Sequence, residues 1–420
     1  MRSLTIAALL CAGALHAQDC SLSFSTPRFR TQLDTGIIYG TAPRFDGGTD
    51  TLRLDLYKPI GDGQLERPLV VMVHGGGFTG GDRSDLDPLC VAFASAGYAT
   101  ATISYRLGFH APPGLSEPWS YDEAEVVRTA YRGMQDTKGA IRFLKGRHLT
   151  DSTSLQNVLL MGFSAGGINA LQAAYLRAAA DKPTAAGAIA PVVRGADTWQ
   201  RPDLGPVDGE LAQNGMDASV LAVVSYFGGL IDTTLLRSSS DPALFMYHQS
   251  GDPVVGCGHE RGLWGMPLGV SDNYPYLFGS CMIDQRAQHL GLTAPRYRFI
   301  EYAGNEHSVH DPYGMLAETL AFMRAQFCTS TSGVEEHTAA DGLQVWPAPS
   351  DGRFQVTLPQ GMPPGGRLTL MDMQGRTVLE RSITGTTLQL EVPGAASGTY
   401  VLRYMRPDGR ALQERIQVVR

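Results

Sequence analysis

Two glycine-rich stretches decide the fold: Gly162–Gly166, with the sequence GFSAG, and His74–Phe78, with the sequence HGGGF. Each follows an apolar run, Val158–Met161 before the first and Leu69–Val73 before the second. Short apolar runs that end in glycine are typical of the buried strands of a parallel sheet. The two stretches therefore predict tight loops that leave one sheet at the ends of two of its strands.

Ser164 lies at the centre of the first stretch. A serine in this position can occupy a strained turn between a strand and a helix, which exposes its hydroxyl. The following segment, Ile168–Leu176, is rich in helix formers, so the N–H of Ala165 would lie at a helix N-terminus, where negative charge is stabilised. The bare glycines of the second stretch let backbone N–H groups approach a substrate oxygen. Together these features predict an acyl-transfer site with Ser164 as the nucleophile.

The acid of such a site is expected after the serine, in a loop at the carboxyl end of a strand. Ala243–His248 has the pattern of a buried strand, and the turn-forming residues after it present Asp252. We therefore predict Asp252 as the acid. Asp232, near the end of the previous strand, is the alternative.

The base is expected last in the chain. The predicted strand Tyr297–Tyr302 is followed by a short loop with His307, which we predict as the base, while His310 is the alternative. The remaining histidines are interpreted as ordinary surface or loop residues: His110, His148, His248, His259 and His289. The sequence has no HExxH motif and no tight cluster of His, Cys and Asp, so we expect neither a metal nor a cofactor.

These stretches resemble the α/β-hydrolase superfamily, and within it the secreted esterases and lipases with HGGG and GxSAG motifs, a group that includes feruloyl and acetylxylan esterases. The resemblance extends over roughly residues 35–328. It implies an α/β fold with a doubly wound, mostly parallel sheet. It also implies that the N–H groups of Gly76, Gly77 and Ala165 form the oxyanion hole.

The expected function is that of a secreted serine carboxylester hydrolase acting on acylated polysaccharide or other bulky esters. A lipase or polyester hydrolase would share the same machinery. A peptidase of the prolyl-oligopeptidase type is disfavoured because no propeller precedes the catalytic segment, and an inactive binding protein is disfavoured because Ser164, Asp252 and His307 are all present. Two insertions, residues 194–217 and 253–294, could form a lid over the site.

Composition predicts a globular protein of two folded units. The chain has 420 residues, of which 43% are hydrophobic and 18% charged. Its net charge of −7 argues against a nucleic-acid partner. Residues 1–17 have the basic start, apolar core and small-residue end of a signal peptide, and the apolar run is too short for a transmembrane segment. We therefore expect an exported protein.

The cysteines agree with export to an oxidising compartment. Removal of the signal peptide would leave five of them: Cys20, Cys90, Cys257, Cys281 and Cys328. Cys257 and Cys281 bracket the second insertion and are the best candidates for a disulfide. A second disulfide could join two of the other three, although Cys90 could equally be a buried helix residue.

The pattern changes after the helix predicted over Pro312–Phe327. A polar segment, residues 329–342, is predicted to be a linker between a catalytic domain, residues 18–328, and a small all-β sandwich, residues 343–420. Short alternating strands separated by Gly and Pro support the sandwich: Arg353–Leu358, Arg367–Asp372, Thr387–Val392 and Thr399–Tyr404.

The carboxyl-terminal segment resembles the sorting domain of the type IX secretion system. The resemblance lies in four stretches: Trp346–Pro349, Asp351–Phe354, Met373–Arg376 and Gly398–Leu402. It implies a partnership with the type IX secretion machinery and delivery to the cell surface or beyond. A carbohydrate-binding module is the alternative, but the segment lacks the row of aromatic residues expected of one.

Overall fold

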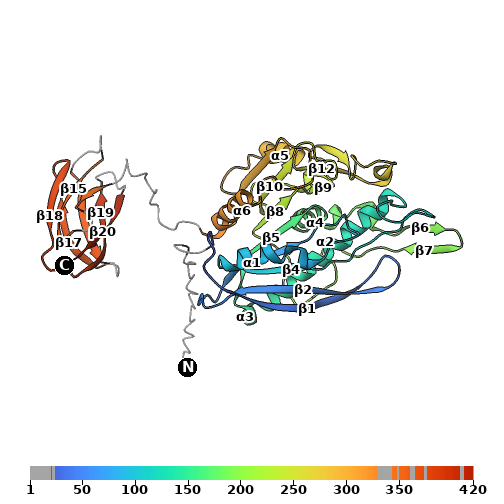
Figure 1. Cartoon of the computed structure of the whole chain (residues 1–420), viewed down its shortest axis with the longest axis horizontal. Helices are drawn as coiled ribbons and strands as arrows, with labels where there is room; N and C mark the ends of the chain where they lie inside the picture. The colour runs from blue at the N-terminus through green and yellow to red at the C-terminus, as the bar shows by residue number, and fades with distance from the viewer. Residues whose placement is uncertain are drawn as a thin grey trace, which may run out of the picture. The chain divides into compact units, whose positions relative to one another are not determined.

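The computed structural model describes residues 20, 24–328, 343–347, 350–359, 365–372, 376–406 and 411–419. The chain forms two compact units, residues 1–328 and 329–420 (Figure 1). The predicted signal peptide and linker lie outside the described residues. Within the part of the chain that is described, no helix is both long and apolar enough to span a membrane.

An eight-stranded sheet forms the centre of the first unit, in the order β1-β2-β4-β3-β5-β8-β10-β13. β1 and β2 form an antiparallel pair, β2 is antiparallel to β4, and every later pair is parallel. The strands are β1 (Thr31–Pro43), β2 (Thr49–Pro59), β3 (Arg67–Val73), β4 (Ala99–Ile103), β5 (Thr153–Phe163), β8 (Ala222–Tyr226), β10 (Ala243–Gln249) and β13 (Tyr297–Tyr302).

Helices cover both faces of this sheet (Figure 1). On one face α2 (Glu123–Gly146), α4 (Ala165–Tyr175) and α5 (Ser280–His289) pack against alternate strand residues such as Val71 and Leu160. On the other face α1 (Asp87–Ser95) and α6 (Pro312–Phe327) pack against the intervening residues, such as Val70. The central strands β3, β4, β8 and β10 are buried on both sides, which explains their continuous apolar runs. The predicted α/β-hydrolase fold is confirmed.

Smaller elements surround the sheet. The strands among them are β6 (Ile189–Arg194), β7 (Asp197–Arg201), β9 (Gly229–Leu230), β11 (His259–Arg261) and β12 (Tyr276–Gly279). The helices are α3 (His148–Asp151), η1 (Arg83–Leu86), η2 (Ala179–Asp181), η3 (Thr184–Ala186), η4 (Thr233–Leu235) and η5 (Val270–Asn273). β6 and β7 form a hairpin, while β11, β12 and β9 form a small antiparallel sheet.

The first insertion differs from the expected lid. Only its start belongs to the β6–β7 hairpin, and the remainder follows α2. Arg128, Gln135 and Arg142 of α2 donate hydrogen bonds to the backbone oxygens of Pro202 (2.6 Å), Leu204 (2.9 Å) and Leu211 (2.8 Å) respectively. Long side chains on one helix face thus hold an irregular segment whose carbonyls would otherwise lack partners.

Two disulfides join cysteines of the described residues. Cys257–Cys281 closes the second insertion, as predicted, and Cys20–Cys328 joins the two ends of the first unit, with Cα atoms 5.8 Å apart. Cys90 is a free, buried residue of α1. The sequence left these pairings open for Cys20, Cys90 and Cys328 because residues so far apart in the chain are brought together only by the fold.

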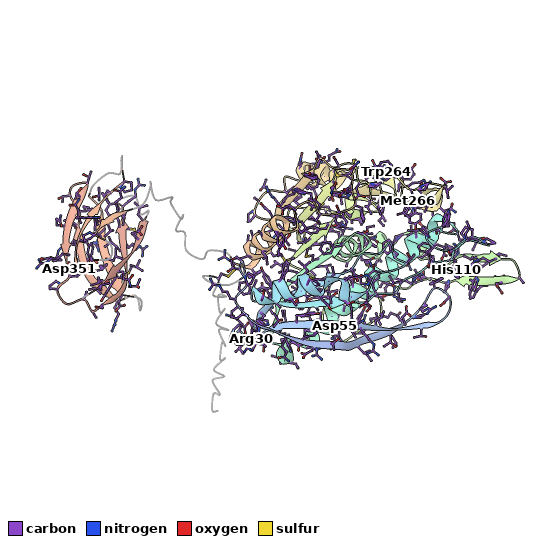
Figure 2. The ribbon with its side chains drawn as sticks, viewed as in Figure 1. Arg30, Asp55, His110, Trp264, Met266 and Asp351 are labelled. Carbon is purple, nitrogen blue, oxygen red and sulfur yellow. A yellow bond between two sulfur atoms is a disulfide. The ribbon has the colours of Figure 1, made fainter. Side chains whose placement is uncertain are left out.

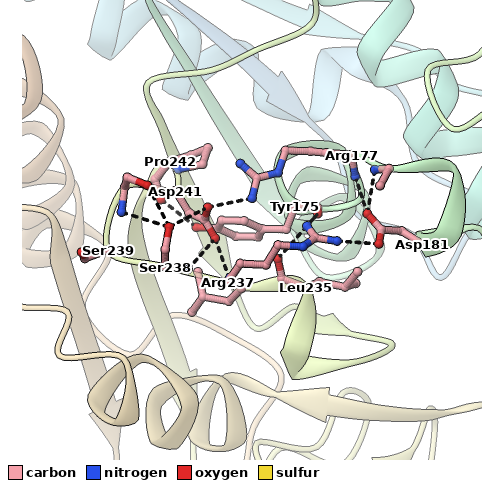
Figure 3. Close-up of polar contacts among 12 residues, drawn as sticks. Tyr175, Arg177, Asp181, Leu235, Arg237, Ser238, Ser239, Asp241 and Pro242 are labelled. Carbon is pink, nitrogen blue, oxygen red and sulfur yellow. Dashed lines mark hydrogen bonds and ion pairs between the residues drawn. The ribbon is translucent and has the colours of Figure 1, made fainter.

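A polar network orients β10 from its amino end (Figure 3). Asp241, just before β10, accepts hydrogen bonds from the N–H groups of Arg237 (2.6 Å) and Ser238 (3.2 Å) and pairs with Arg177 beyond α4 (2.7 Å). Burial acts to raise the pKa of Asp241, but the bond from Arg177 and the backbone donors lower it. The network therefore ties the end of α4 to the start of the strand that presents Asp252.

The second unit is a β-sandwich of two antiparallel sheets, β14-β15-β18 and β17-β16-β19-β20. Its strands are β14 (Gln344–Trp346), β15 (Arg353–Thr357), β16 (Arg367–Asp372), β17 (Thr377–Ser382), β18 (Thr387–Glu391), β19 (Gly398–Met405) and β20 (Ala411–Val418). Alternate residues such as Phe354, Leu370 and Leu402 fill its core. Residues 348–349 and 373–375, which belong to the stretches that resemble a sorting domain, lie outside the described residues.

Candidate active site

Ser164 lies between the end of β5 and the start of α4. Its backbone has φ 54° and ψ −123°, a conformation that a residue with a side chain rarely adopts and that costs on the order of 1–3 kcal/mol. Two backbone bonds hold it there: Ser164 N–H donates to Tyr226 O (2.9 Å), and Ile168 N–H donates to Ser164 O (2.9 Å). The expected strand-to-helix turn is present, with the hydroxyl at its apex.

The glycines around Ser164 are required by close backbone approach. A Cβ atom on Gly162 would lie 2.1 Å from the carbonyl oxygen of Gly166. A Cβ atom on Gly166 would lie 2.2 Å from the carbonyl oxygen of Val73, on the neighbouring strand. Backbone atoms cannot yield to such contacts as a flexible side chain can. The two glycines are therefore required by close packing, Gly162 against the turn itself and Gly166 against the end of β3.

Strand register brings the predicted residues to one edge of the sheet. Phe163 of β5 pairs with Tyr226 of β8, and Tyr226 pairs with Tyr247 of β10, which in turn pairs with Ile300 of β13. Parallel strands end at the same edge, so the loops after β5, β10 and β13 converge. These are the loops that carry Ser164, Asp252 and His307.

A chain of short hydrogen bonds links the three side chains. His307 Nε2 lies 2.7 Å from Ser164 Oγ, and His307 Nδ1 lies 2.7 Å from Asp252 Oδ2. Asp252 is fully buried, whereas the His307 side chain is 20% exposed. The ring of Phe227 packs against the imidazole with its centroid 4.6 Å away. The serine and the carboxylate are thus joined through an imidazole that is open to solvent on one side.

Asp252 is held as a carboxylate by its surroundings. Its Oδ1 accepts hydrogen bonds from the N–H groups of Val254 (2.8 Å) and Val255 (3.1 Å). Burial acts to raise the pKa of Asp252, but the bonds from His248 and His307 outweigh it and lower the pKa to about 2. The group is therefore ionised at neutral pH although it is buried.

His248 corrects the sequence interpretation, because it is fully buried beneath Asp252 and not a surface residue. Its Nε2 lies 2.7 Å from Val255 O and 3.5 Å from Asp252 Oδ2, while Nδ1 lies 2.9 Å from Ser280 Oγ. A carbonyl oxygen only accepts, so Nε2 carries the proton, and Nδ1 accepts from the serine hydroxyl. The strand pattern around His248 was apolar, and that signal could have indicated its burial.

The HGGGF loop lies against the serine turn. A Cβ atom on Gly75 would lie 3.2 Å from Ser164 Cβ, so this loop and the turn are in contact. Gly76 and Gly77 have φ +109° and +60°, and Gly76 O accepts from Gly80 N–H (2.9 Å), which makes the loop a tight turn. In the described part of the chain, no backbone acceptor is found for the N–H groups of Gly76 and Gly77.

His74, the first residue of this loop, is held in place by Tyr105. Its ring is buried and stacks on Tyr105, with centroids 4.5 Å apart, and the Tyr105 hydroxyl donates to His74 O (3.0 Å). On the other side, Ala165 is the first residue of α4, where the N–H groups have no acceptor within the helix. Free donors from two loops therefore flank the serine hydroxyl.

The alternative residues lie elsewhere. The exposed Asp232 caps η4 by accepting from Thr234 N–H (2.8 Å). His310 stacks on Tyr302, with centroids 3.7 Å apart, and its Nδ1 lies 2.9 Å from the Tyr247 hydroxyl. Neither takes part in the chain of bonds from Ser164 to Asp252.

The other histidines give a mixed result. His259 and His289 are exposed and His148 is half-buried, but His110 is buried, which the sequence interpretation missed. Burial lowers the pKa of His110, although Glu125 acts against this. Among the described residues there is no group of three or more His, Cys, Asp and Glu side chains that could hold a metal ion.

Comparison with known proteins identifies two parts of the chain. Residues 54–114 match the model of the BD-FAE family, and residues 344–418 match the model of the secretion system C-terminal sorting domain. No curated protein sequence matches the chain.

Several solved structures are similar to a large part of this chain at low identity. A truncated carbohydrate esterase from gut microbiota is 15% identical, with a TM-score of 0.43, over 72% of this chain and 100% of its own. A bifunctional GH43-CE protein from Bacteroides eggerthii is 17% identical, with a TM-score of 0.45, over 70% of this chain and 35% of its own. Native esterase 2 of Thermogutta terrifontis is 15% identical, with a TM-score of 0.44, over 72% of this chain and 95% of its own.

The fold and the matched esterase segment define a carboxylic ester hydrolase of the α/β-hydrolase class. This chain has a segment similar to the BD-FAE family and, after it, one that matches a type IX sorting domain, which indicates export to the cell surface or beyond.

Proposed function

We propose that this protein is a serine carboxylester hydrolase in which Ser164, His307 and Asp252 form the catalytic triad, and that it cleaves acylated polysaccharides or other bulky esters outside the cell. The observation that carries the proposal is the unbroken chain of two 2.7 Å contacts from the strained serine through the imidazole to the buried carboxylate. Nucleophile, base and orienting acid are the three roles that ester cleavage by serine requires.

In the first half of the reaction, Ser164 Oγ attacks the ester carbonyl carbon while His307 Nε2 takes the hydroxyl proton. His307 Nδ1–H donates to Asp252, which fixes the tautomer and stabilises the imidazolium. The imidazolium then returns the proton to the leaving alcohol as the C–O bond breaks, and an acyl-serine remains. Water, activated by the same imidazole, releases the acid and restores the serine hydroxyl.

The N–H groups of Gly76, Gly77 and Ala165 are proposed to stabilise the oxyanion of the tetrahedral intermediate. Two observations support this: they flank the serine from two loops, and those of Gly76 and Gly77 have no backbone acceptor within the described residues. Removing one such donor in a related system costs about 3 kcal/mol of transition-state stabilisation.

A bulky substrate is supported by the surface next to the acid. Trp264 is 45% exposed and Met266 is 42% exposed, and both are labelled in Figure 2. Trp264 is fixed in place because its Nε1–H donates to the backbone oxygen of Asp252 (2.7 Å). An exposed aromatic plane beside the triad suits a sugar ring or an aromatic acyl group. The neighbouring Leu268, 83% exposed, also keeps a lipase or polyester hydrolase as the second candidate.

A rate panel tests the proposal: nitrophenyl acetate, butyrate and palmitate, methyl ferulate, acetylated xylan and a peptide anilide. We expect fast cleavage of the short esters and of at least one polysaccharide or ferulate ester, and none of the anilide. A preference for palmitate would favour the lipase.

Two inhibitors test the proposed chemistry. An organophosphate should inactivate the enzyme and modify Ser164, whereas EDTA should leave the rate unchanged. Loss of activity in EDTA that added metal restores would contradict a metal-free mechanism.

A further inference from the structure

A cavity of about 710 Å³ lies at the β6–β7 hairpin, outside the proposed triad. Its wall is formed by the turn between β1 and β2, by the first half of α2 and by β7 with the residues after it. His110, labelled in Figure 2, belongs to the wall. None of Ser164, Asp252 and His307 lines this cavity, so the triad chemistry does not account for it.

Buried guanidinium groups dominate this wall. Arg106 is paired with Asp136 (2.7 Å), and Arg201 is paired with Asp122 (2.7 Å). Arg132, which is only 3% exposed, differs from these two because it has no carboxylate partner among the described residues. Its Nη2–H donates to the backbone oxygen of Gly108 (2.8 Å), its Nε–H has no partner, and no carboxylate of the described residues lies within ion-pair distance of it.

Arg128 lies one helical turn before Arg132 on α2, on the same helix face, and is also buried. It donates only to backbone oxygens, those of Ala185, Gly187 and Pro202. The wall therefore contains two buried cations for which the described residues supply no carboxylate partner.

The acids of the wall do not supply the missing counter-ion. Asp46 pairs with Arg44, Asp203 with Lys182, and Glu125 with Arg201 at 3.4 Å. Glu210 is exposed.

A buried cation without a counter-ion is costly. Burial, with the neighbouring Arg106, lowers the pKa of Arg132 to about 10, so the group is still charged at neutral pH. An anion that entered the cavity would supply the missing negative charge beside Arg132 and Arg128, since a guanidinium attracts a carboxylate strongly where water is excluded.

Aromatic rings line the same cavity as these arginines. The rings of His110 and Trp199 have centroids 5.2 Å apart, and Phe45 packs edge-on against His110 at 4.9 Å. Trp199 is only half-buried and lines the cavity. Aromatic planes pack against the apolar C–H face of a sugar ring. The wall thus combines a surface for a ring with a buried charge for an acidic substituent.

We propose that this cavity is a binding subsite for a sugar that carries a carboxylate, such as a uronic acid unit of a polysaccharide. The inference rests on the proposed polysaccharide substrate and extends it. A structural link supports the connection: Gly108, whose oxygen Arg132 binds, donates its N–H to Phe78 O (2.7 Å), and Phe78 directly follows Gly77. The subsite and the oxyanion loop are therefore joined through a single residue, Gly108.

Calorimetric titration of the Ser164→Ala protein tests the proposal without turnover. The probes are a xylo-oligosaccharide with a glucuronic acid branch, the same oligosaccharide without the branch, and sodium sulfate. We expect the acidic oligosaccharide to bind at least about tenfold more tightly than the neutral one, with a preference that weakens as salt is raised. Equal binding of the two oligosaccharides would overturn the proposal, and so would sulfate binding as tightly as the acidic sugar.

Variants locate the site. Arg132→Met should abolish the preference for the acidic oligosaccharide, whereas Arg298→Met, which removes an exposed arginine paired with Glu318, should keep it. Should Arg132→Met not fold, Trp199→Ala replaces it and should weaken binding of the acidic oligosaccharide. A preference unchanged by Arg132→Met, or binding of the acidic oligosaccharide unchanged by Trp199→Ala, would place the subsite elsewhere. Hydrolysis of nitrophenyl acetate by the unaltered enzyme tests the triad separately, so the two proposals can fail independently.

Discussion

At the scale of single residues, the proposed chemistry depends on an unbroken proton path from Ser164 to His307. We predict that Ser164→Ala and His307→Ala each lower turnover by at least about 10⁴-fold, because nucleophile and base act as one unit. His310→Ala should have a small effect, since His310 contacts Tyr247 and Tyr302 and not the serine. Turnover of nitrophenyl butyrate and thermal unfolding of each variant check this. A large loss in His310→Ala with His307→Ala active would move the base.

Asp252→Asn should lower turnover by about 10⁴-fold, because the amide presents the wrong partner to His307 Nδ1. Asp232→Asn, which alters only the cap of η4, is the matched control and should be nearly neutral. If Asp232→Asn proved the more damaging, the acid would have been assigned to the wrong loop.

The low pKa of Asp252 leads us to predict an effect of pH on the stability of the folded protein. The pKa of Asp252 in the folded protein is about 2, below its ordinary value of 3.8. The ionised carboxylate therefore stabilises the folded state at pH values above 3.8, and this contribution to the free energy of unfolding is lost as the pH falls from 3.8 towards 2. The free energy of unfolding of Asp252→Asn should fall less steeply between these two pH values than that of the unaltered protein. Parallel curves in denaturant titrations would contradict the low pKa.

Sequence reasoning reached Ser164, Asp252 and His307 because each follows a recognisable strand and a loop. It could not choose firmly between Asp252 and Asp232, or between His307 and His310, because that choice depends on strand register. It also missed the burial of His248 and His110. The apolar strand around His248 could have indicated its burial, whereas the contact that buries His110, with Phe45, comes from the fold around it and leaves no pattern of its own.

At the scale of elements, the turn between β5 and α4 is the feature on which the site depends. Gly166→Ala should unfold or strongly destabilise the protein, by at least about 3 kcal/mol, because the new Cβ would lie 2.2 Å from Val73 O and 2.4 Å from His74 O. Chemical denaturation measures the loss.

The matched control is Gly195→Ala in the turn of the β6–β7 hairpin. Gly195 also has a positive φ, +64°, but no atom lies within 4 Å of the point that a Cβ atom would occupy, so only the backbone term of about 1–2 kcal/mol is expected. Similar losses at both glycines would show that close packing against β3 is not what requires Gly166.

Some helices and strands could be predicted from the sequence, whereas the course of the first insertion could not. The strands and helices with strong apolar patterns, such as β10, β13 and α6, occur where they were predicted. The first insertion was expected as a lid because its composition is that of a loop. Its actual course along α2 is set by Arg128, Gln135 and Arg142, whose backbone partners lie 69 to 74 residues away in the chain. Such contacts have no local periodicity that a sequence could reveal.

At the scale of the whole molecule, each unit has hydrophobic cores of its own, since none of the clusters of buried residues in the described part of the chain contains residues of both units. The disulfide Cys20–Cys328 closes the first unit at its last residue, and the three residues of the proposed triad all lie within this unit. We therefore predict that truncation after Ser332 leaves a folded hydrolase with nearly unchanged turnover on a small soluble ester.

The truncated protein should in turn lose export through the type IX system, because the sorting domain lies in the removed part. Two measurements separate the roles: kcat on nitrophenyl acetate with purified truncated protein, and the location of full-length and truncated chains in a host with type IX secretion. The closed disulfide and the complete sheet give the physical reason for independence, since every strand from β1 to β13 precedes the cut. An insoluble or inactive truncated enzyme would instead show that the sandwich is needed to fold the catalytic unit.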